Sequence, residues 1–131
     1  MITTDFLLSG KAVFTVANPS EERYTFKVYK AEKLNLFFVS MLTGSNNNTD
    51  YTYIGRFSTE YKQLVITSKS KITHNSKPFK VFNWAIKHIV TQKTVPDGYF
   101  IEHNGHCGRC GRVLTTPESI KSGLGPVCRG K

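Results

Sequence analysis

No stretch of this sequence comes near the unbroken apolar run of about 20 residues that a bilayer-spanning helix requires. The first residues, MITTDFLLSGKAVF, lack the basic segment and the longer apolar segment that mark a secretory signal. The chain also lacks internal repeats and low-complexity runs. Its 131 residues suit one domain of ordinary size, or one domain with a small appendage. We therefore expect a soluble, cytosolic protein with no membrane partner.

Acidic residues are scarce, since nine Asp and Glu stand against 18 Lys and Arg, for a formal charge of +9. Residues 1–58 carry six basic against five acidic residues, whereas residues 59–131 carry twelve against four. Clustered Lys and Arg displace counterions from phosphates, so this asymmetry favours a polyanionic partner such as DNA or RNA. A solvated basic surface that only serves solubility is the alternative interpretation.

Cysteine is also rare, and all three cysteines lie in the segment HNGHCGRCGRVLTTPESIKSGLGPVC, residues 103–128. Cys107 and Cys110 form a C-x2-C pair with a glycine after each, the shape of a zinc knuckle whose backbone amides point at the thiolates. The same spacing occurs in thiol–disulfide exchange enzymes, but there the first cysteine begins a helix beside a βαβ unit. Cys128 follows at a distance seen for the second half of a zinc site. The pattern therefore favours zinc binding over redox chemistry.

A closed tetrahedral zinc site needs a fourth ligand besides three thiolates, and two histidines compete for this position. His106 adjoins Cys107, and the side chains of sequence neighbours usually point apart. His103 lies four residues before Cys107, with a glycine between, and could swing in from the end of a preceding strand. We predict one structural Zn²⁺, with His106 as the alternative fourth ligand. The predicted ligands are His103, Cys107, Cys110 and Cys128.

A short helix is predicted between the second and third cysteines. Thr115 or Thr116 would cap this helix, Pro117 would lie in its first turn, and Gly123 would end it. An element of this size has no hydrophobic core of its own, so a metal ion is the natural source of its stability.

The first half of the chain reads as short strands rich in β-branched and aromatic residues, separated by turn-forming stretches. In RYTFKVYK, residues 23–30, alternation puts Tyr24, Phe26 and Val28 on a core face and Lys27 on a face that meets water or a ligand. The predicted strands of an antiparallel sheet are residues 11–17, 23–30, 35–42, 51–57 and 63–67.

One main helix is predicted over FKVFNWAIKHIV, residues 79–90, with Ser76 as its cap and Pro78 in its first turn. Its apolar stripe should pack on the sheet and comprises Phe79, Phe82, Ile86, Ile89 and Val90. The expected fold class is α+β. An antiparallel sheet and one main helix would occupy residues 1–95, and a small zinc-knuckle or treble-clef-like module would occupy residues 96–131.

The run GHCGRCGRVLTTPESIKSGLGPVC resembles a small zinc-binding module of unknown function that recurs in bacteriophage and actinobacterial proteins. The Arg-Cys-Gly-Arg, Pro-Glu-Ser-Ile and Gly-Pro elements coincide in order and spacing over about residues 103–130. In that family a histidine often stands four residues before the first cysteine, as His103 does, whereas His106 stands where arginine is usual. The resemblance implies a phage or prophage protein acting in the bacterial cytoplasm, and it implies no activity.

Basic residues surround the proposed zinc site and continue along the main helix. We predict a nucleic-acid-binding protein without catalysis, in which zinc shapes a contact loop and Lys and Arg hold the phosphate backbone. The alternative is an adaptor or inhibitor that binds a host or defence enzyme. The residues predicted to contact nucleic acid are Arg109, Arg112, Lys80, Lys87, Lys121 and Arg129.

Signatures of catalysis are missing. The chain has no phosphate-cradling glycine loop, no serine elbow, and no H-x-E motif paired with the P-C-x-x-C of zinc deaminases. The acidic residues near the proposed zinc site are Glu102 and Glu118, and a helix-capping role already accounts for Glu118. We therefore expect no enzymatic activity, and the sequence identifies no small-molecule substrate.

Overall fold

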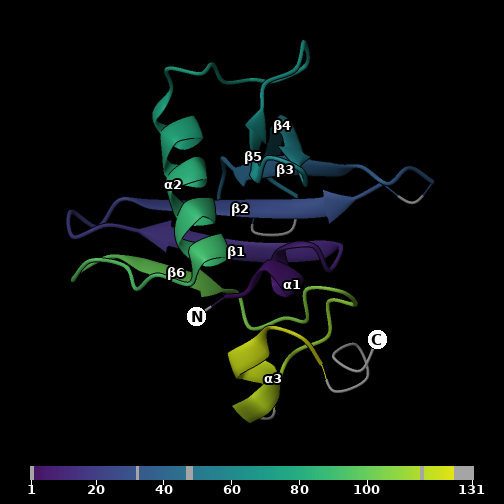
Figure 1. Ribbon diagram of the computed structural model, residues 1–131, viewed down its shortest axis with the longest axis vertical. Helices are drawn as coiled ribbons and strands as arrows, with labels where there is room; N and C mark the ends of the chain where they lie inside the picture. Colours follow the sequence, from purple (N-terminus) through teal and green to yellow (C-terminus); the bar gives the residue numbers. More distant parts are fainter. Residues whose placement is uncertain (1, 32, 47–48, 116, 126–131) are drawn as a thin grey trace.

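The structure is a computed structural model that describes residues 2–31, 33–46, 49–115 and 117–125 (Figure 1). Six antiparallel strands form one sheet in the order β5-β4-β3-β2-β1-β6, so the last strand returns to pair with the first. This sheet and the long helix that crosses one of its faces form the predicted α+β architecture. The strands are β1 (Lys11–Ala17), β2 (Arg23–Lys30), β3 (Phe37–Leu42), β4 (Tyr51–Ser58), β5 (Gln63–Val65) and β6 (Phe100–His103).

The alternation predicted for β2 is confirmed. Phe26 and Val28 are fully buried, and the half-buried Tyr24 packs against the same core. Antiparallel pairing sets Phe26 opposite Phe14 and Val28 opposite Ala12, so the core face of β2 continues into β1. Side chains with the other parity therefore form the second face of the sheet.

A β-bulge separates the two halves of the β3–β4 pairing. Val39 lies opposite Gly55 and Ser40 lies opposite Tyr53, which leaves Ile54 as the extra residue of β4. Ile54 is fully buried in the core. Because the bulge restores alternation after this residue, Tyr53 lies on the face away from the core.

Helix α2 (Lys77–Thr91) covers the core face of the sheet (Figure 1). Ser76 precedes it and Pro78 lies in its first turn, as predicted. The Ser76 hydroxyl makes no cap bond, however, and donates instead to the Thr73 carbonyl at 2.7 Å. Proline in the first turn needs no N–H acceptor, which lowers the demand for a capping side chain.

The buried face of α2 differs from the predicted stripe at one position. Val90 is 38% exposed, so its assignment to the core was wrong, and Ala85 is buried instead. Val90 follows Ile89 by one residue and is therefore turned roughly 100° away from it around the helix. The centre of the packing is Phe82, whose ring meets the ring of Phe26 edge-on at 5.1 Å between centroids.

A short N-terminal helix, α1 (Thr4–Leu7), was not predicted. Thr3 caps it by accepting a 3.2 Å hydrogen bond from the Phe6 N–H. Phe6 and Leu7 are fully buried in the same core cluster as the sheet and α2. The start of the chain is thus part of the core.

The C-terminal segment begins within the sheet, because Ile101 of β6 is buried in the core and lies opposite Val16. Helix α3 (Pro117–Ser122) lies beyond the β6 edge (Figure 1). It ends at Gly123, as predicted, where φ is +76° and the N–H donates to the Ser119 carbonyl at 2.8 Å. Neither α1, α2 nor α3 combines the length and the apolar character that a membrane crossing demands.

Candidate metal centre

The C-x2-C pair lies at the tip of a tight hairpin. His106 and Val113 form a β-bridge, and the Leu114 N–H donates to the Gly105 carbonyl at 2.8 Å. Closer to the tip, the Cys107 N–H donates to the Arg112 carbonyl at 2.7 Å. Another short bond runs from the Gly111 N–H to the Cys107 carbonyl, at 2.9 Å, and Gly111 has a φ of +81° that L side chains rarely adopt. The chain therefore reverses tightly at the C-x2-C pair.

The hairpin places backbone amides around the Cys107 sulfur. Cys107 is fully buried, and burial alone would raise the pKa of its thiol. Hydrogen bonds from the backbone of Gly125, Cys110 and Arg109, together with the Cys110 side chain, outweigh burial and lower this pKa from an ordinary value of 9.0 to about 6. The bond from the Arg109 N–H measures 3.4 Å. The site therefore favours the thiolate, which is the form that binds metals.

The chain after α3 returns to this sulfur. A Cβ placed on Gly125 would lie 3.9 Å from Cys107 Sγ, and the Gly125 backbone hydrogen-bonds to the same atom. Cys128 comes three residues later but lies outside the described residues. Within the described ranges, Cys107 and Cys110 are free thiols and no three His, Cys, Asp or Glu side chains gather as a metal-binding group.

The His103 ring connects β6 to α3. Its Nδ1 accepts a 2.9 Å hydrogen bond from the Gly105 N–H, so Nε2 carries the proton of the neutral ring and donates to the Ile120 carbonyl. The ring also lies 5.7 Å from the ring of Phe6, between centroids. Both ring nitrogens of His103 therefore have backbone partners.

His106, the alternative fourth ligand, lies on the exposed side of the hairpin. Its backbone N–H donates to the Asn104 side-chain oxygen at 3.2 Å. The side chain is exposed, whereas its neighbour Cys107 points into the protein. The two neighbours thus point apart, as sequence reasoning expected.

Sequence reasoning missed the side chain that joins the hairpin to the core, which is Phe6. A Cβ on Gly108 would lie 2.8 Å from the Phe6 ring, and a Cβ on Gly123 would lie 2.4 Å from it. The Gly108 N–H donates to the Gly123 carbonyl at 2.8 Å, and the Gly108 carbonyl accepts from the Lys11 N–H at 2.6 Å. The hairpin, the end of α3 and the start of β1 therefore form one packed unit around Phe6.

The residues predicted to contact nucleic acid do not form one cluster. Arg109 and Arg112 are exposed on the hairpin, whereas Lys80 and Lys87 are exposed on α2, seven residues apart on its outward face. Three of the lysines line separate cavities. Lys80 lines a cavity of about 280 Å³ beside Trp84, Lys87 one of about 300 Å³ beside Tyr61, and Lys121 one of about 300 Å³ beside His103. Arg129 lies outside the described residues.

Trp84 packs against the hydrophobic core. Its ring lies 4.4 Å from that of His88 and 5.2 Å from that of Tyr99, between centroids. It is half-buried beside β1 and β2, at the cavity that Lys80 also lines. Its ring neighbours thus come from α2 itself and from the segment just before β6.

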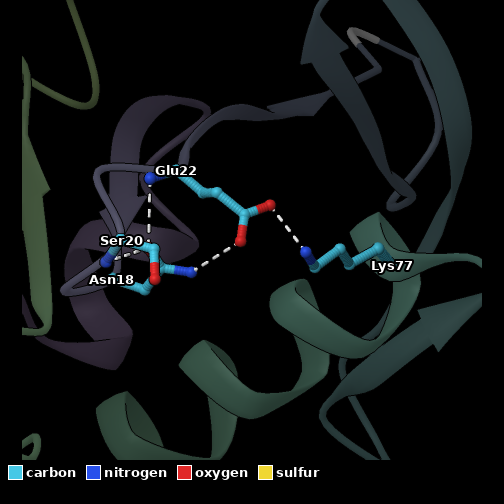
Figure 2. Close-up of polar contacts among 4 residues, drawn as sticks. All are labelled: Asn18, Ser20, Glu22 and Lys77. Atoms are coloured by element: carbon cyan, nitrogen blue, oxygen red, sulfur yellow. Dashed lines mark hydrogen bonds and ion pairs between the residues drawn. The ribbon is translucent and has the colours of Figure 1, made fainter.

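One ion pair is present among the described residues, between Lys77 at the start of α2 and Glu22 just before β2 (Figure 2). Lys77 Nζ lies 2.6 Å from Glu22 Oε2, and the other carboxylate oxygen accepts from the Asn18 side-chain amide at 3.1 Å. The Lys77 hydrogen bond lowers the pKa of Glu22 most, followed by the bond from Asn18. The remaining lysines and arginines in the described ranges carry unpaired positive charge.

Comparison with known proteins finds a match for the C-terminal segment. Residues 99–131 match a family of unknown function, DUF6011. The match contains all three cysteines and His103, and it covers the segment for which sequence reasoning found a resemblance to an uncharacterised family. No curated protein and no solved structure was found to match the chain.

Proposed function

We propose that this is a basic nucleic-acid-binding protein without catalytic activity, whose residues 96–131 are organised by one structural Zn²⁺. The ligands would be Cys107, Cys110, Cys128 and His103. In this proposal the zinc module presents Arg109 and Arg112 to the phosphate backbone, and exposed lysines of α2 and α3 extend the contact. The protein would act in the cytoplasm of a bacterial host as a phage or prophage protein, as the sequence resemblance implies.

The surroundings of Cys107 support the zinc part of the proposal. Backbone amides that converge on a buried cysteine sulfur stabilise a thiolate, and a thiolate without a cation is costly in a buried position. The chain returns to the same sulfur at Gly125, three residues before Cys128 in the sequence. When bound, zinc would supply the missing positive charge and join the hairpin to the chain end.

His103 fits the role of fourth ligand through Nδ1. Metal-binding histidines commonly donate their other ring N–H to a backbone carbonyl, and His103 Nε2–H already donates to the Ile120 carbonyl. Ligation through Nδ1 would displace only the bond from the Gly105 N–H. His106 would reach the cysteines only by turning in from the exposed side of the hairpin.

The charge distribution supports the nucleic-acid part of the proposal. The chain carries a net charge of +9. Among the described lysines in the second half of the chain, only Lys77 is neutralised by an ion pair. Arg109 and Arg112 flank the knuckle in exposed positions, and arginine suits bidentate contact with phosphate. Unpaired cations release counterions from a polyanion on binding, which is the main source of affinity in such complexes.

An adaptor or inhibitor of a host or defence enzyme is the second candidate function. A surface that mimics the electrostatics of a nucleic-acid binder would also suit a protein with an acidic binding site. The two candidates differ in salt dependence, because a protein complex with an apolar interface centre tolerates salt better than phosphate contacts do.

The proposal is tested by replacing Arg109 and Arg112 together with Ala. Binding to nucleic acid should weaken about equally for all sequences, and the salt dependence should flatten by roughly one unit of slope per lost contact. Zinc content should stay unchanged. The measurement is fluorescence anisotropy at several salt concentrations.

A double replacement of Lys33 and Lys93 with Ala is the matched control, because both lysines are exposed and lie outside the hairpin and α2. An equal loss of affinity in the control and in the arginine variant would mean that net charge, and not the hairpin, drives binding. That result would contradict the proposed contact.

A further inference from the structure

The face of the sheet opposite α2 carries a group of aromatic and basic side chains that the zinc module does not include. We call it the outer face and define it by the strand residues whose parity is opposite to that of the core. Register places Arg56, Phe38 and Tyr29 in one cross-strand row, and Tyr53, Ser40 and Lys27 in the next. The outer face also includes Tyr51, opposite Leu42.

The aromatic rings of the outer face form a continuous group across three strands. Tyr29 and Phe38 lie 5.8 Å apart between ring centroids, and Phe38 and Tyr53 lie 6.1 Å apart, both pairs tilted. All three rings and that of Tyr51 are partly exposed. Ser40 is buried beneath them, 3.5 Å from the Tyr29 hydroxyl, so the rings stand on a packed base.

Cations lie among these rings. Lys27 Nζ is 5.7 Å from the centroid of Tyr29 and 5.4 Å from that of Tyr51, which are cation–π distances. Arg56 is exposed opposite Phe38, and the exposed Lys71 donates its backbone N–H to the Tyr53 carbonyl at 3.2 Å. None of these three cations has an ion-pair partner within the described ranges.

Acidic residues are few on the outer face. Asp50, next to Tyr51, is engaged by its own loop, because its Oδ2 accepts from the Asn46 N–H at 2.9 Å. Glu102 lies opposite Thr15 at the β6 edge, and two strands, β1 and β2, separate β6 from β3. Among the described residues, the charge beside the rings of β2, β3 and β4 is therefore positive.

No described helix covers the outer face. α1 and α2 contribute their buried residues to the core cluster, and α3 lies beyond the β6 edge (Figure 1). The loop after β5 contacts Tyr53, whose hydroxyl lies 3.1 Å from the Thr67 hydroxyl and whose carbonyl accepts from the Lys71 N–H at 3.2 Å.

We propose that the outer face binds single-stranded nucleic acid, with unpaired bases stacking on Tyr29, Phe38, Tyr51 and Tyr53 and phosphates held by Lys27, Arg56 and Lys71. Aromatic rings that lie beside cations without an ion-pair partner suit this ligand, because every base has a π-face and every nucleotide carries a negative charge. Paired bases in a duplex cannot lie on such a surface without unstacking, so the face selects single strands. The inference rests on the proposed function for its class of ligand, but it assigns a different site.

The test measures anisotropy of a labelled single strand of about 12 nucleotides, DNA and RNA in separate arms, with a duplex of the same sequence as a third ligand. Phe38→Leu and Tyr53→Leu keep an apolar side chain while removing the ring, and each should weaken single-strand binding by roughly tenfold. Tyr61→Leu is the matched control, because Tyr61 is 71% exposed and lies outside the outer face. Lys27→Ala should weaken binding more than Lys93→Ala.

A second measurement uses the unmodified protein, so it does not depend on whether the variants fold. Photo-cross-linking of a 5-iodouridine strand to the unmodified protein, followed by peptide mapping, should label Tyr29, Phe38, Tyr51 or Tyr53. Labelling of Tyr61 or Trp84 instead, duplex binding as tight as single-strand binding, or ring variants that lose less than about twofold would each overturn the inference.

The two sites can fail separately. If the ring variants weaken binding while the Arg109 and Arg112 variant does not, the outer face stands and the proposed hairpin contact fails. The reverse result removes the outer face and retains the hairpin contact. If the unmodified protein binds none of the ligands, both are wrong.

Discussion

The environment of the Cys107 sulfur is set mainly by backbone groups. The C-x2-C spacing predicted that amides would surround a thiolate, and the structure has three backbone groups hydrogen-bonded to this atom. The bonds of His103 could not be predicted in the same way. Its partner Ile120 is 17 residues away, and only the packing of α3 beside β6 brings the two together.

The lowered pKa of Cys107 predicts a pH dependence of stability in the metal-free protein. Between about 6 and 9.0 the folded state holds a thiolate while the unfolded state holds a thiol, so unfolding binds a proton. The free energy of unfolding should therefore rise with pH across this window, and this contribution should be fully lost below about 6. Urea titrations with chelator present, at several pH values, measure it.

Cys107→Ser is the control for this dependence, because serine does not titrate in the window. The variant should show a flatter profile than the parent protein over the same pH range. A steeper rise in the variant, or stability of the parent protein that falls with pH, would contradict the assignment.

The choice of fourth ligand leads to a second prediction at the residue scale. His103→Ala should lower zinc affinity and change the d–d absorption of the Co²⁺-substituted protein, because a nitrogen ligand is replaced by water. His106→Ala should leave both unchanged. Metal analysis should find near-stoichiometric zinc in the unmodified protein. If His106→Ala lowers zinc affinity and changes the absorption while His103→Ala does neither, the ligand assignment is wrong.

At the scale of elements, strands and helices were predictable where the periodic pattern of apolar residues extended over enough residues to be recognised. β1 and β2 match their predicted ranges, because both alternate over seven residues or more between clear turns. α1 spans four residues, too few for a helical period to appear. The β4 bulge was equally hidden, since a single extra residue looks like ordinary strand sequence until its partner strand is known.

The junction around Phe6 predicts that Gly108 accepts no larger residue. Gly108→Ala would put a Cβ 2.3 Å from the Ser9 hydroxyl oxygen and 2.8 Å from the Phe6 ring, so the hairpin or α1 must shift. Overpacking of this kind should cost about 1–3 kcal/mol of unfolding free energy. Thermal or urea unfolding measures the loss.

Lys121→Ala, an exposed change on the neighbouring helix, is the control for the Gly108 variant and should stay within about 0.5 kcal/mol of the parent protein. A Gly108→Ala protein as stable as this control would mean that the hairpin is not packed on α1.

At the scale of the whole molecule, the lysines and arginines of the described residues are spread over several surfaces and not gathered into one track. The asymmetry of basic residues was visible in the sequence, but their distribution depends on the fold. Lys77 is neutralised by Glu22, 55 residues away in sequence. Lys27, which belongs to the nearly neutral half, lies instead between two tyrosine rings of the outer face. Local composition alone could not predict that Lys77 would be neutralised by a carboxylate while Lys27 would lie beside aromatic rings.

Binding of nucleic acid is the central claim, and an electrophoretic mobility shift panel tests it most directly. The panel uses single- and double-stranded DNA and RNA, each at a low and a high salt concentration. We predict measurable binding at low salt, stronger for single strands, and a steep loss at high salt because released counterions drive the association. No affinity for any of the four forms at low salt would contradict the account and leave the adaptor function in its place.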